Sequence, residues 1–225
     1  MKKHTLSNLS LLMVLFLAIG FSACEKEDTT EPTPDPIPVV NQYEPWTQAE
    51  IDLIMSGEAD EPMRILVTSN EEDSLFLTKQ TIPIEPDAND PILIRLRERM
   101  IKTMIDGGGV GIAGPQVGIS RALFWCKRFD LEDKPFQFII NPKILFYSVK
   151  MITFLYDGCL SIPDYTGSTA TRRHSSIFVE YYTQDGIKEQ NILEGTSSSN
   201  FTAVCFQHEY DHLQGILFPE RVNVP

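Results

Sequence analysis

The sequence is poor in positive charge. Its 225 residues include 19 Lys and Arg against 31 Asp and Glu, which gives a formal net charge of -12. Because binding to a nucleic acid requires clustered Lys and Arg that neutralise phosphates, this composition argues against a nucleic-acid partner. The sequence also shows no internal repeat and no second globular segment, which favours one folded domain with appendages.

The N-terminus carries an apolar run that is too short for a stable transmembrane helix. The run follows Lys2 and Lys3 and ends in "FSAC" at Cys24. A short positive segment, a brief apolar segment and small residues predict a secretory signal. "FSAC" resembles a bacterial lipobox, in which the cysteine is diacylated and becomes the mature N-terminus. The alternative is an ordinary signal peptide with an incidental cysteine.

The next segment, "EKEDTTEPTPDPIPVVN", is acidic, rich in Thr and Pro, and lacks apolar periodicity. It is predicted to be a disordered tether. We therefore expect a signal peptide in residues 1–24, a tether in residues 25–43 and one folded domain in residues 44–225. The protein is expected to be exported and anchored to the bacterial membrane through a lipid on Cys24, on the periplasmic or cell-surface side.

Cysteine is scarce as well, and no disulfide framework is predicted. With Cys24 assigned to the lipid, Cys126, Cys159 and Cys205 remain. An odd number of thiols in an oxidising compartment indicates that at least one has another role. Cys126 lies in an apolar strand, where a free cysteine is usually a small core residue. Cys159 follows a strand in "YDGCLSIP", in a loop where a ligand can be held exposed.

Helices flank a run of strands in the folded part. Thr47 and Glu50 form a capping box that predicts a helix over residues 47–57. Asp90 as N-cap and Pro91 at the first helical position predict a second helix, which three glycines end. Strands are expected over residues 122–129, 136–142, 143–148 and 151–156, followed by a hairpin in 175–193 with Asp185-Gly186 at or near its turn. A last helix is expected in 197–215, with a Ser as N-cap and Gly215 at its end. This order indicates an α+β fold.

The segment "CFQHEYDHLQG", residues 205–215, gathers ionisable side chains on the last helix. His208 and His212 are four positions apart, so both imidazoles can point at one metal ion. Glu209 lies about 100° further round the helix and can reach a water on that ion without binding the ion itself. This is the H-E-x-x-H arrangement. The alternative is a pair of buried, hydrogen-bonded histidines beside a surface glutamate.

The third ligand of this site is expected upstream. A zincin-type peptidase takes it from downstream, where the only acid is Glu220, close to the end of the helix. Upstream, the candidates are His174 and the three remaining thiols. Among the thiols, Cys159 is the most suitably placed and Cys205 could pack beneath the site.

Three motifs together resemble the peptide deformylase family, over most of residues 60–221. "GVGIAGPQ", residues 109–116, is similar to the glycine-rich motif of that family, and "DGCLS", residues 157–161, to its E-G-C-L-S motif. "QHEYDHLQG", residues 207–215, is complete. The resemblance implies an α+β fold with antiparallel sheets around a central metal-binding helix that carries the H-E-x-x-H segment. It also implies an expected monomer that acts on N-formyl peptides.

The resemblance assigns roles to the residues of these motifs. Cys159, His208 and His212 would hold one divalent metal, Fe²⁺ first, with Zn²⁺, Ni²⁺ or Co²⁺ possible. Glu209 would carry the proton from water to the leaving amine. The Gln116 side chain and the Leu160 backbone N–H would donate to the developing oxyanion. The products would be formate and a free amine.

Substrate-binding roles follow from the same resemblance. Gly109, Gly111 and Ile112 would let a peptide lie alongside as an added strand, although a helix stop and tight turn also explain the glycines. Arg173 matches a position where family members carry a peptide-contacting arginine; the alternative is a solvated charge. Asp211 would hold an imidazole or a neighbouring loop.

Two positions depart from the family motifs. Asp157 stands where the motif has Glu, so the rigidity of the loop that carries Cys159 is in question. Gly114 replaces an alanine, which would loosen the loop that carries Gln116. Both departures bear on the catalytic rate more than on the type of reaction.

Three hypotheses therefore stand. The first is an anchored deformylase acting on secreted or scavenged formyl peptides. The second is another metallohydrolase, such as a peptidase or amidase. The third is an inactive relative that binds formyl peptides or a surface partner.

Overall fold

The computed structural model describes residues 43–195 and 199–222, all within one unit, Asn41–Pro225. The predicted signal peptide with Cys24, and the predicted tether up to residue 42, lie outside the described residues. Within the described ranges, no helix combines the length and apolarity needed to cross a membrane.

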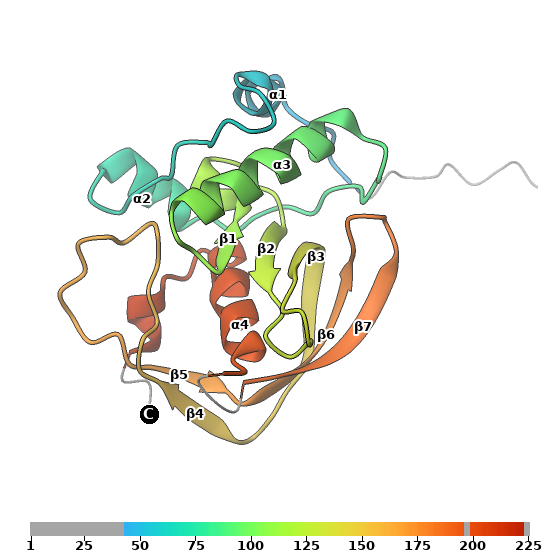
Figure 1. Cartoon of the computed structure of the whole chain (residues 1–225). Helices are drawn as coiled ribbons and strands as arrows, with labels where there is room; N and C mark the ends of the chain where they lie inside the picture. The colour runs from blue at the N-terminus through green and yellow to red at the C-terminus, as the bar shows by residue number, and fades with distance from the viewer. Residues whose placement is uncertain (1–42, 196–198, 223–225) are drawn as a thin grey trace, which may run out of the picture. The chain divides into compact units, whose positions relative to one another are not determined.

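Two antiparallel sheets and four α-helices make up this part of the chain (Figure 1). The larger sheet has the strand order β1-β2-β3-β6-β7, and the smaller one pairs β4 with β5. The helix α4 packs against strands of both sheets. This confirms the predicted α+β class with antiparallel sheets. The helices are α1 (Gln48–Met55), α2 (Glu71–Leu77), α3 (Pro91–Asp106) and α4 (Thr202–Leu213), with 3₁₀ turns η1 (Gly114–Val117) and η2 (Phe218–Arg221). The strands are β1 (Gly111–Ala113), β2 (Leu123–Lys127), β3 (Phe136–Tyr147), β4 (Met151–Phe154), β5 (Thr171–His174), β6 (Ser176–Tyr182) and β7 (Lys188–Glu194).

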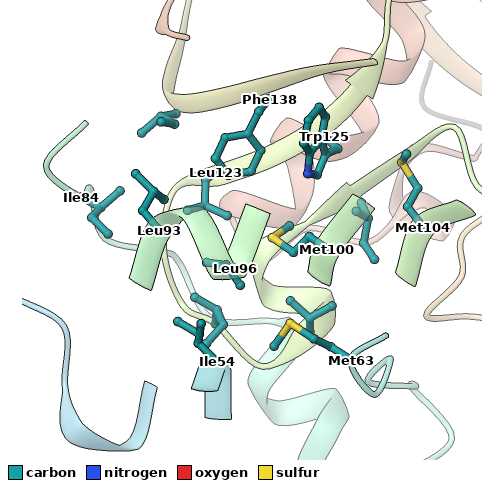
Figure 2. Close-up of a cluster of buried hydrophobic side chains, with 14 residues drawn as sticks. Ile54, Met63, Ile84, Leu93, Leu96, Met100, Met104, Leu123, Trp125 and Phe138 are labelled. Atoms are coloured by element: carbon teal, nitrogen blue, oxygen red, sulfur yellow. The ribbon is translucent and has the colours of Figure 1, made fainter. Parts of the chain in front are cut away.

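The predicted helix starts at Thr47 and Asp90 are confirmed. Thr47 and Glu50 form the capping box of α1, and the Asp90 side chain accepts from the backbone N–H of Ile92 at the start of α3. The apolar face of α3 packs between α1 and the strands β2 and β3 (Figure 2). The buried members of this cluster include Ile54, Met63, Ile84, Leu93, Leu96, Met100, Met104, Leu123, Trp125 and Phe138.

The structure corrects two predicted boundaries. The two strands expected over residues 136–142 and 143–148 are one strand, β3. It bends at Asn141, whose backbone has a φ of 49° and whose side chain bonds to both backbone groups of Ile84. The following proline therefore marks a bulge in the strand, not its end. Last, α4 begins after Phe201, which cannot cap it through its side chain, so the expected Ser cap is wrong.

Apart from the three-residue strand β1 and the two 3₁₀ turns, two elements have no counterpart among the predictions. One is α2, which Asn70 begins by accepting from the backbone N–H of Asp73. The other is β5, which pairs with β4 and directly precedes the hairpin strand β6. The hairpin itself is confirmed, because β6 and β7 pair throughout and Gly186 takes a φ of 72° in the turn between them.

Two buried arginines hold residues 44–62 to the rest of the fold. Arg121 is fully buried, and its guanidinium donates to the Glu50 carboxylate at 2.6 and 2.7 Å and to the backbone oxygens of Glu44 and Pro45. Arg99 donates to backbone oxygens that include those of Ile54 and Glu61. Because a buried guanidinium needs many acceptors, each arginine fixes a specific path of the backbone around it.

Candidate active site

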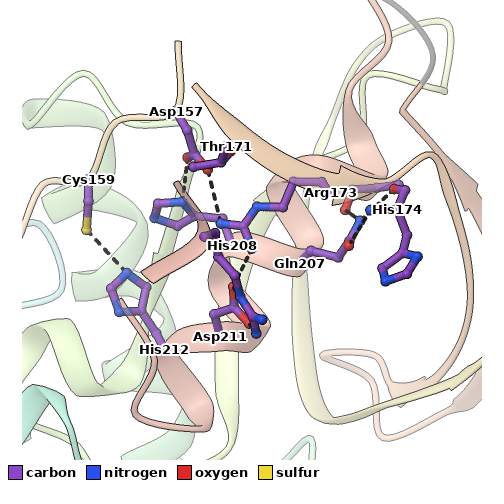
Figure 3. A network of polar contacts seen from close by, with 11 residues as sticks. Asp157, Cys159, Thr171, Arg173, His174, Gln207, His208, Asp211 and His212 are labelled. Carbon is purple, nitrogen blue, oxygen red and sulfur yellow. Dashed lines mark hydrogen bonds and ion pairs between the residues drawn. The ribbon is translucent and has the colours of Figure 1, made fainter. Parts of the chain in front are cut away.

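Cys159, His208 and His212 lie together, where the loop that carries Cys159 meets α4 (Figure 3). Each residue offers one ligand atom, and the three atoms lie within 4.8 Å of one another. The two histidines project from one face of α4, as the four-residue spacing predicts. Cys159 comes from the loop between β4 and β5, and its Sγ lies 3.3 Å from His212 Nε2.

His174 is not part of this cluster. Its Nδ1 lies 2.7 Å from the backbone oxygen of Ser148, and its ring packs against that of Tyr147. Of the candidates for a third ligand, the structure therefore places Cys159 beside the histidine pair. Cys205 lies one helical turn before Glu209 and donates weakly to the backbone oxygen of Val110 at 3.5 Å.

The donor set fits a divalent metal. Burial alone would raise the pKa of the Cys159 thiol, but His212 and His208 lower the pKa to about 5, which favours the thiolate at neutral pH. One thiolate and two imidazoles are common ligands of Zn²⁺, Fe²⁺ and related ions. In addition, Glu209 Oε2 is buried without a hydrogen-bond partner among the described residues. Buried polar atoms of this kind are usually satisfied by a bound ion or by water.

Asp157 orients His208 from behind. The carboxylate accepts from His208 Nδ1 at 2.6 Å, from Thr171 Oγ1 at 2.7 Å and from Arg173 Nη2 at 3.0 Å. Burial would raise the pKa of Asp157, but His208 and Arg173 hold it well below its usual value. With Nδ1 engaged in this way, Nε2 of His208 is the nitrogen left for the cluster. Asp157 is thus long enough to reach its partners, despite being shorter than the Glu of the family motif.

Arg173 takes a different position from the one expected. Its side chain is 2% exposed, and its guanidinium bridges Asp157 and Asp211 (Figure 3). It does not line the cavity that Cys159, His208 and Glu209 line. The structure therefore does not support the expected contact between Arg173 and a peptide, because both of its carboxylate partners hold it inside the protein. Asp211 in turn binds Arg221 through two hydrogen bonds.

Glu209 lies buried beside the cluster. It is 4% exposed, and this burial raises the pKa of its carboxyl group to about 7, against the opposing effect of His208 and His212. A Cβ atom added to Gly111 would lie 2.2 Å from Glu209 Oε1. Gly111 is therefore needed because the carboxylate packs directly on its Cα. A carboxylate with a pKa near neutrality suits a group that must both accept and release a proton.

Gln116 reaches the same cluster from η1. Its Oε1 accepts from the backbone N–H of Ala113 at 2.9 Å, so its Nε2 is turned toward Cys159 Sγ, at 3.5 Å, and Ser161 Oγ, at 3.2 Å. Gly114, at the start of η1, is tightly enclosed, since a Cβ there would lie 2.8 Å from the backbone oxygen of Ile119. The expectation that Gly114 loosens this loop is therefore not supported.

A cavity of about 570 Å³ is lined by Gln116, Cys159, His208 and Glu209. Gly109, Gly111 and Leu160 line its wall as expected, and β1 is the edge strand of the larger sheet. Ile112 differs, because its side chain is fully buried in the core and only its backbone can meet a ligand. The sequence analysis missed the apolar end of the cavity, formed by Phe154, Tyr156, Phe201 and Val204. Their only signal was the spacing of Phe201 and Val204 on the face of α4 that carries His208.

Comparison with known proteins agrees with this geometry. A family model described as polypeptide deformylase matches residues 63–225. The peptide deformylase of Agrobacterium fabrum is 38% identical over 136 residues, which cover 60% of this chain and 75% of that protein. The peptide deformylase of Caulobacter vibrioides is 33% identical over 161 residues, covering 71% of this chain and 87% of that protein.

Solved structures show the same likeness. A class I type b peptide deformylase from Acinetobacter baumannii superposes with a TM-score of 0.61 at 32% identity, covering 72% of this chain and 99% of that one. The peptide deformylase of Thermotoga maritima gives a TM-score of 0.61 at 33% identity, covering 73% of this chain and 99% of that one.

Proposed function

The chain belongs to the peptide deformylase family, and from this we infer that Cys159, His208 and His212 form its catalytic metal centre. The enzyme is a metal-dependent hydrolase that removes the formyl group of N-formylmethionyl peptides and gives formate and a free amine. The observation that carries the assignment is that the ligand atoms of Cys159, His208 and His212 lie within 4.8 Å of one another, beside a cavity that Glu209 also lines. A zincin-type peptidase is not favoured, because the third candidate ligand lies upstream of α4.

The metal is proposed to be Fe²⁺, with Zn²⁺, Ni²⁺ or Co²⁺ as alternatives. When bound, such an ion supplies Lewis acidity that polarises the formyl carbonyl and lowers the pKa of water toward neutrality. The cysteine contributes a thiolate, and Asp157 holds His208 with Nε2 facing the cluster. Ferrous iron with a thiolate ligand is sensitive to oxidants. An exported enzyme would therefore use Fe²⁺ in an anaerobic setting, or a redox-silent ion such as Zn²⁺.

Glu209 is proposed to move the proton. Its carboxylate accepts the proton of the attacking water and later delivers it to the leaving amine. Burial supports both steps, because it raises the pKa of Glu209 to about 7 and so brings the two protonation states close in free energy. The contact with Gly111 fixes the carboxylate on one side.

Gln116 and Leu160 are proposed to stabilise the oxyanion. The Gln116 amide is held by its bond to Ala113, so its Nε2 is aimed at the cluster before substrate arrives. The backbone N–H of Leu160 directly follows Cys159. In other enzymes a well-aimed donor of this kind contributes about 3 kcal/mol to stabilisation of the transition state.

The peptide is proposed to bind along β1 as an added strand. Gly109 and Gly111 leave room for its backbone, and β1 is an open edge of the sheet. The apolar end of the cavity, lined by Phe154 and Phe201, suits the side chain of methionine. A deformylase of Acinetobacter baumannii has been solved with Met-Ala-Ser bound, which supports a peptide as the ligand here.

The test is a formate-release assay on anaerobically purified protein whose metal content is measured in parallel. N-formyl-Met-Ala-Ser should be hydrolysed, whereas N-acetyl-Met-Ala-Ser should not. Cys159→Ser should lose metal and activity together, and the matched change Cys126→Ser, at a buried thiol outside the cavity, should keep both. A metal-loaded wild type that releases no formate would overturn the assignment.

We further propose that the enzyme is exported and lipid-anchored through Cys24. The support is Lys2, Lys3, the apolar run and "FSAC" in the sequence. At such a location nascent chains are out of reach, and secreted or scavenged formyl peptides become the substrates. Cells labelled with a palmitate analogue should show labelled wild-type protein in the membrane fraction and unlabelled Cys24→Ala. Unlabelled wild-type protein in the cytoplasm would contradict the lipid anchor. It would leave the assignment of the enzymatic activity unaffected.

A further inference from the structure

A second cavity lies against a different face of α4. It has a volume of about 270 Å³ and is lined from the helix by Gln207, Tyr210 and Asp211. These residues follow the three- and four-residue spacing of one helix face, which differs from the face that carries His208 and Glu209. The helix therefore separates this cavity from the catalytic one. The remaining walls come from β3, β4, β5 and η2.

The charge of this cavity is unusual for the protein. Its lining includes the residues Arg172, Arg173 and Arg221, whereas Asp211 is its only acidic residue. The chain as a whole has 31 acidic residues against 19 Lys and Arg. Positive charge that is gathered in a hollow with low-dielectric walls attracts anions more strongly than the same charge on a flat surface.

The single carboxylate is already fully engaged. Asp211 accepts from Arg173 Nη1, and from Arg221 Nε at 3.0 Å and Nη2 at 2.6 Å (Figure 3). Arg173 Nε, in contrast, is buried and has no acceptor among the described residues. A buried donor without an acceptor is costly, so the Arg173 guanidinium keeps hydrogen-bonding capacity that Asp157 and Asp211 do not use.

Two tyrosines add neutral donors to the same wall. Tyr147 and Tyr210 both line the cavity. Burial raises the pKa of Tyr147, and the neighbouring Tyr210 and Asp211 raise it further, while Arg221 opposes them. The Tyr147 hydroxyl therefore keeps its proton at neutral pH and can donate it. The ring of Tyr147 also packs against that of His174, with centroids 4.7 Å apart, which gives the wall a fixed shape.

We propose that this cavity binds a phosphoryl group, either as free phosphate or as the headgroup of an anionic phospholipid. Guanidinium groups match phosphate oxygens through pairs of parallel hydrogen bonds. A phosphoryl group has three or four oxygen atoms for the arginine and tyrosine donors, whereas a carboxylate has two. The volume of the cavity leaves room for the group and for part of its substituent. The site lies one side chain from the catalytic centre, because Arg173 contacts both Asp211 and Asp157.

Calorimetric titration of the metal-loaded protein tests the proposal with two probes. Inorganic phosphate represents the free ion, and dihexanoyl phosphatidylglycerol below its micelle concentration represents the headgroup. Arg172→Gln should weaken binding at least about tenfold, as expected for a hydrogen-bonded charge. Arg97→Gln, a matched change at a partly exposed arginine of α3 outside this cavity, should leave it unchanged. Met151→Trp fills the cavity without altering charge and should abolish binding, so the test does not depend on Arg172 alone.

The possible results distinguish a free-phosphate site, a lipid-headgroup site and the absence of a phosphoryl site. Binding of phosphate alone identifies a free-phosphate site, and binding of the lipid alone, or far more tightly, identifies a headgroup site. In either case binding must be lost in Arg172→Gln and in Met151→Trp. If neither probe binds, or if Arg172→Gln and Arg97→Gln bind equally well, the cavity is not a phosphoryl site.

Discussion

The Asp157 carboxylate lies 2.6 Å from Nδ1 of His208, although Asp157 is one methylene shorter than the residue expected from the family motif. The loop between β4 and β5 therefore brings the backbone of Asp157 close to α4. Its other oxygen binds Thr171 and Arg173, so the whole carboxylate is used. The distances from the Asp157 backbone to these three partners therefore fit an aspartate side chain.

Asp157→Asn should lower metal affinity about 10- to 100-fold, the range found when the partner of a metal-binding histidine is removed. An amide can accept from His208 through one oxygen only and no longer pairs with Arg173. Metal affinity, measured by competition with a chromophoric chelator, checks this. Asp157→Glu is the informative companion: if the loop is fitted to aspartate, the glutamate variant should also bind metal more weakly. Wild-type affinity in both variants would contradict the orienting role.

Glu209→Gln should keep the metal but lose at least about 100-fold in kcat, since an amide cannot accept the proton of water. Metal content and formate release, measured on the same samples, provide the readout. Glu72→Gln changes an exposed glutamate of α2 and serves as the control. Near-normal turnover of metal-loaded Glu209→Gln would rule out Glu209 as the base.

Gly111→Ala should reduce kcat at least about tenfold without unfolding the protein. The new Cβ would lie 2.2 Å from Glu209 Oε1, so the carboxylate has to move. Displacing a catalytic group by about 1 Å is enough to cost one to two orders of magnitude. Gly158→Ala, in the same cavity, is the matched control because a Cβ there meets nothing within 4 Å. Equal activity of the two variants would show that the contact does not position Glu209.

The ion pair between Glu50 and Arg121 should make stability depend on pH. Burial would raise the pKa of Glu50, but hydrogen bonds from Arg121 and Thr47 lower it below 4.5, its ordinary value. A carboxyl group with a depressed folded-state pKa stabilises the fold above its unfolded-state pKa, and this contribution is lost as the pH falls through the folded-state value. The Tm difference between wild type and Glu50→Gln should therefore be large at pH 7 and shrink below about pH 4.5.

Glu58→Gln is the control for this series, because Glu58 pairs with Arg95 at 3.3 Å but its side chain is 77% exposed. Exposed ion pairs of this kind contribute little to stability. A Tm difference for Glu50→Gln that stays constant from pH 7 to pH 3 would contradict the ion-pair account.

Side chains with fixed local spacing were the predictable part of the site. The histidine pair follows from the helical repeat, and the candidate thiol from its place in a loop after a strand. The role of Arg173 could not be predicted in this way. Arg172 and Arg173 are adjacent on β5, and successive side chains of a strand point to opposite faces. The sequence does not say which face is buried, because that depends on where Asp157 and Asp211 lie in the fold.

Ile112 and α2 illustrate the same limit. A glycine-rich motif beside an apolar residue fits both a substrate-binding strand and a core strand, and packing of Ile112 into the core cluster decides the matter. The helix α2 has seven residues, which is less than two helical turns. A helix this short does not show an apolar periodicity in the sequence. Its cap, Asn70, is the one local signal that could have marked it.

Arg121 also determines how the chain responds to mechanical load. One guanidinium makes four hydrogen bonds, two to the Glu50 carboxylate and one each to the carbonyls of Glu44 and Pro45. A force applied to the chain before residue 44 therefore acts on the hydrogen bonds of Arg121. These bonds have to break before α1 can separate from the core. The helix α4, which carries His208 and His212, lies at the opposite end of the sequence. We therefore expect tension that enters before residue 44 to act on the Arg121 contacts before it reaches α4.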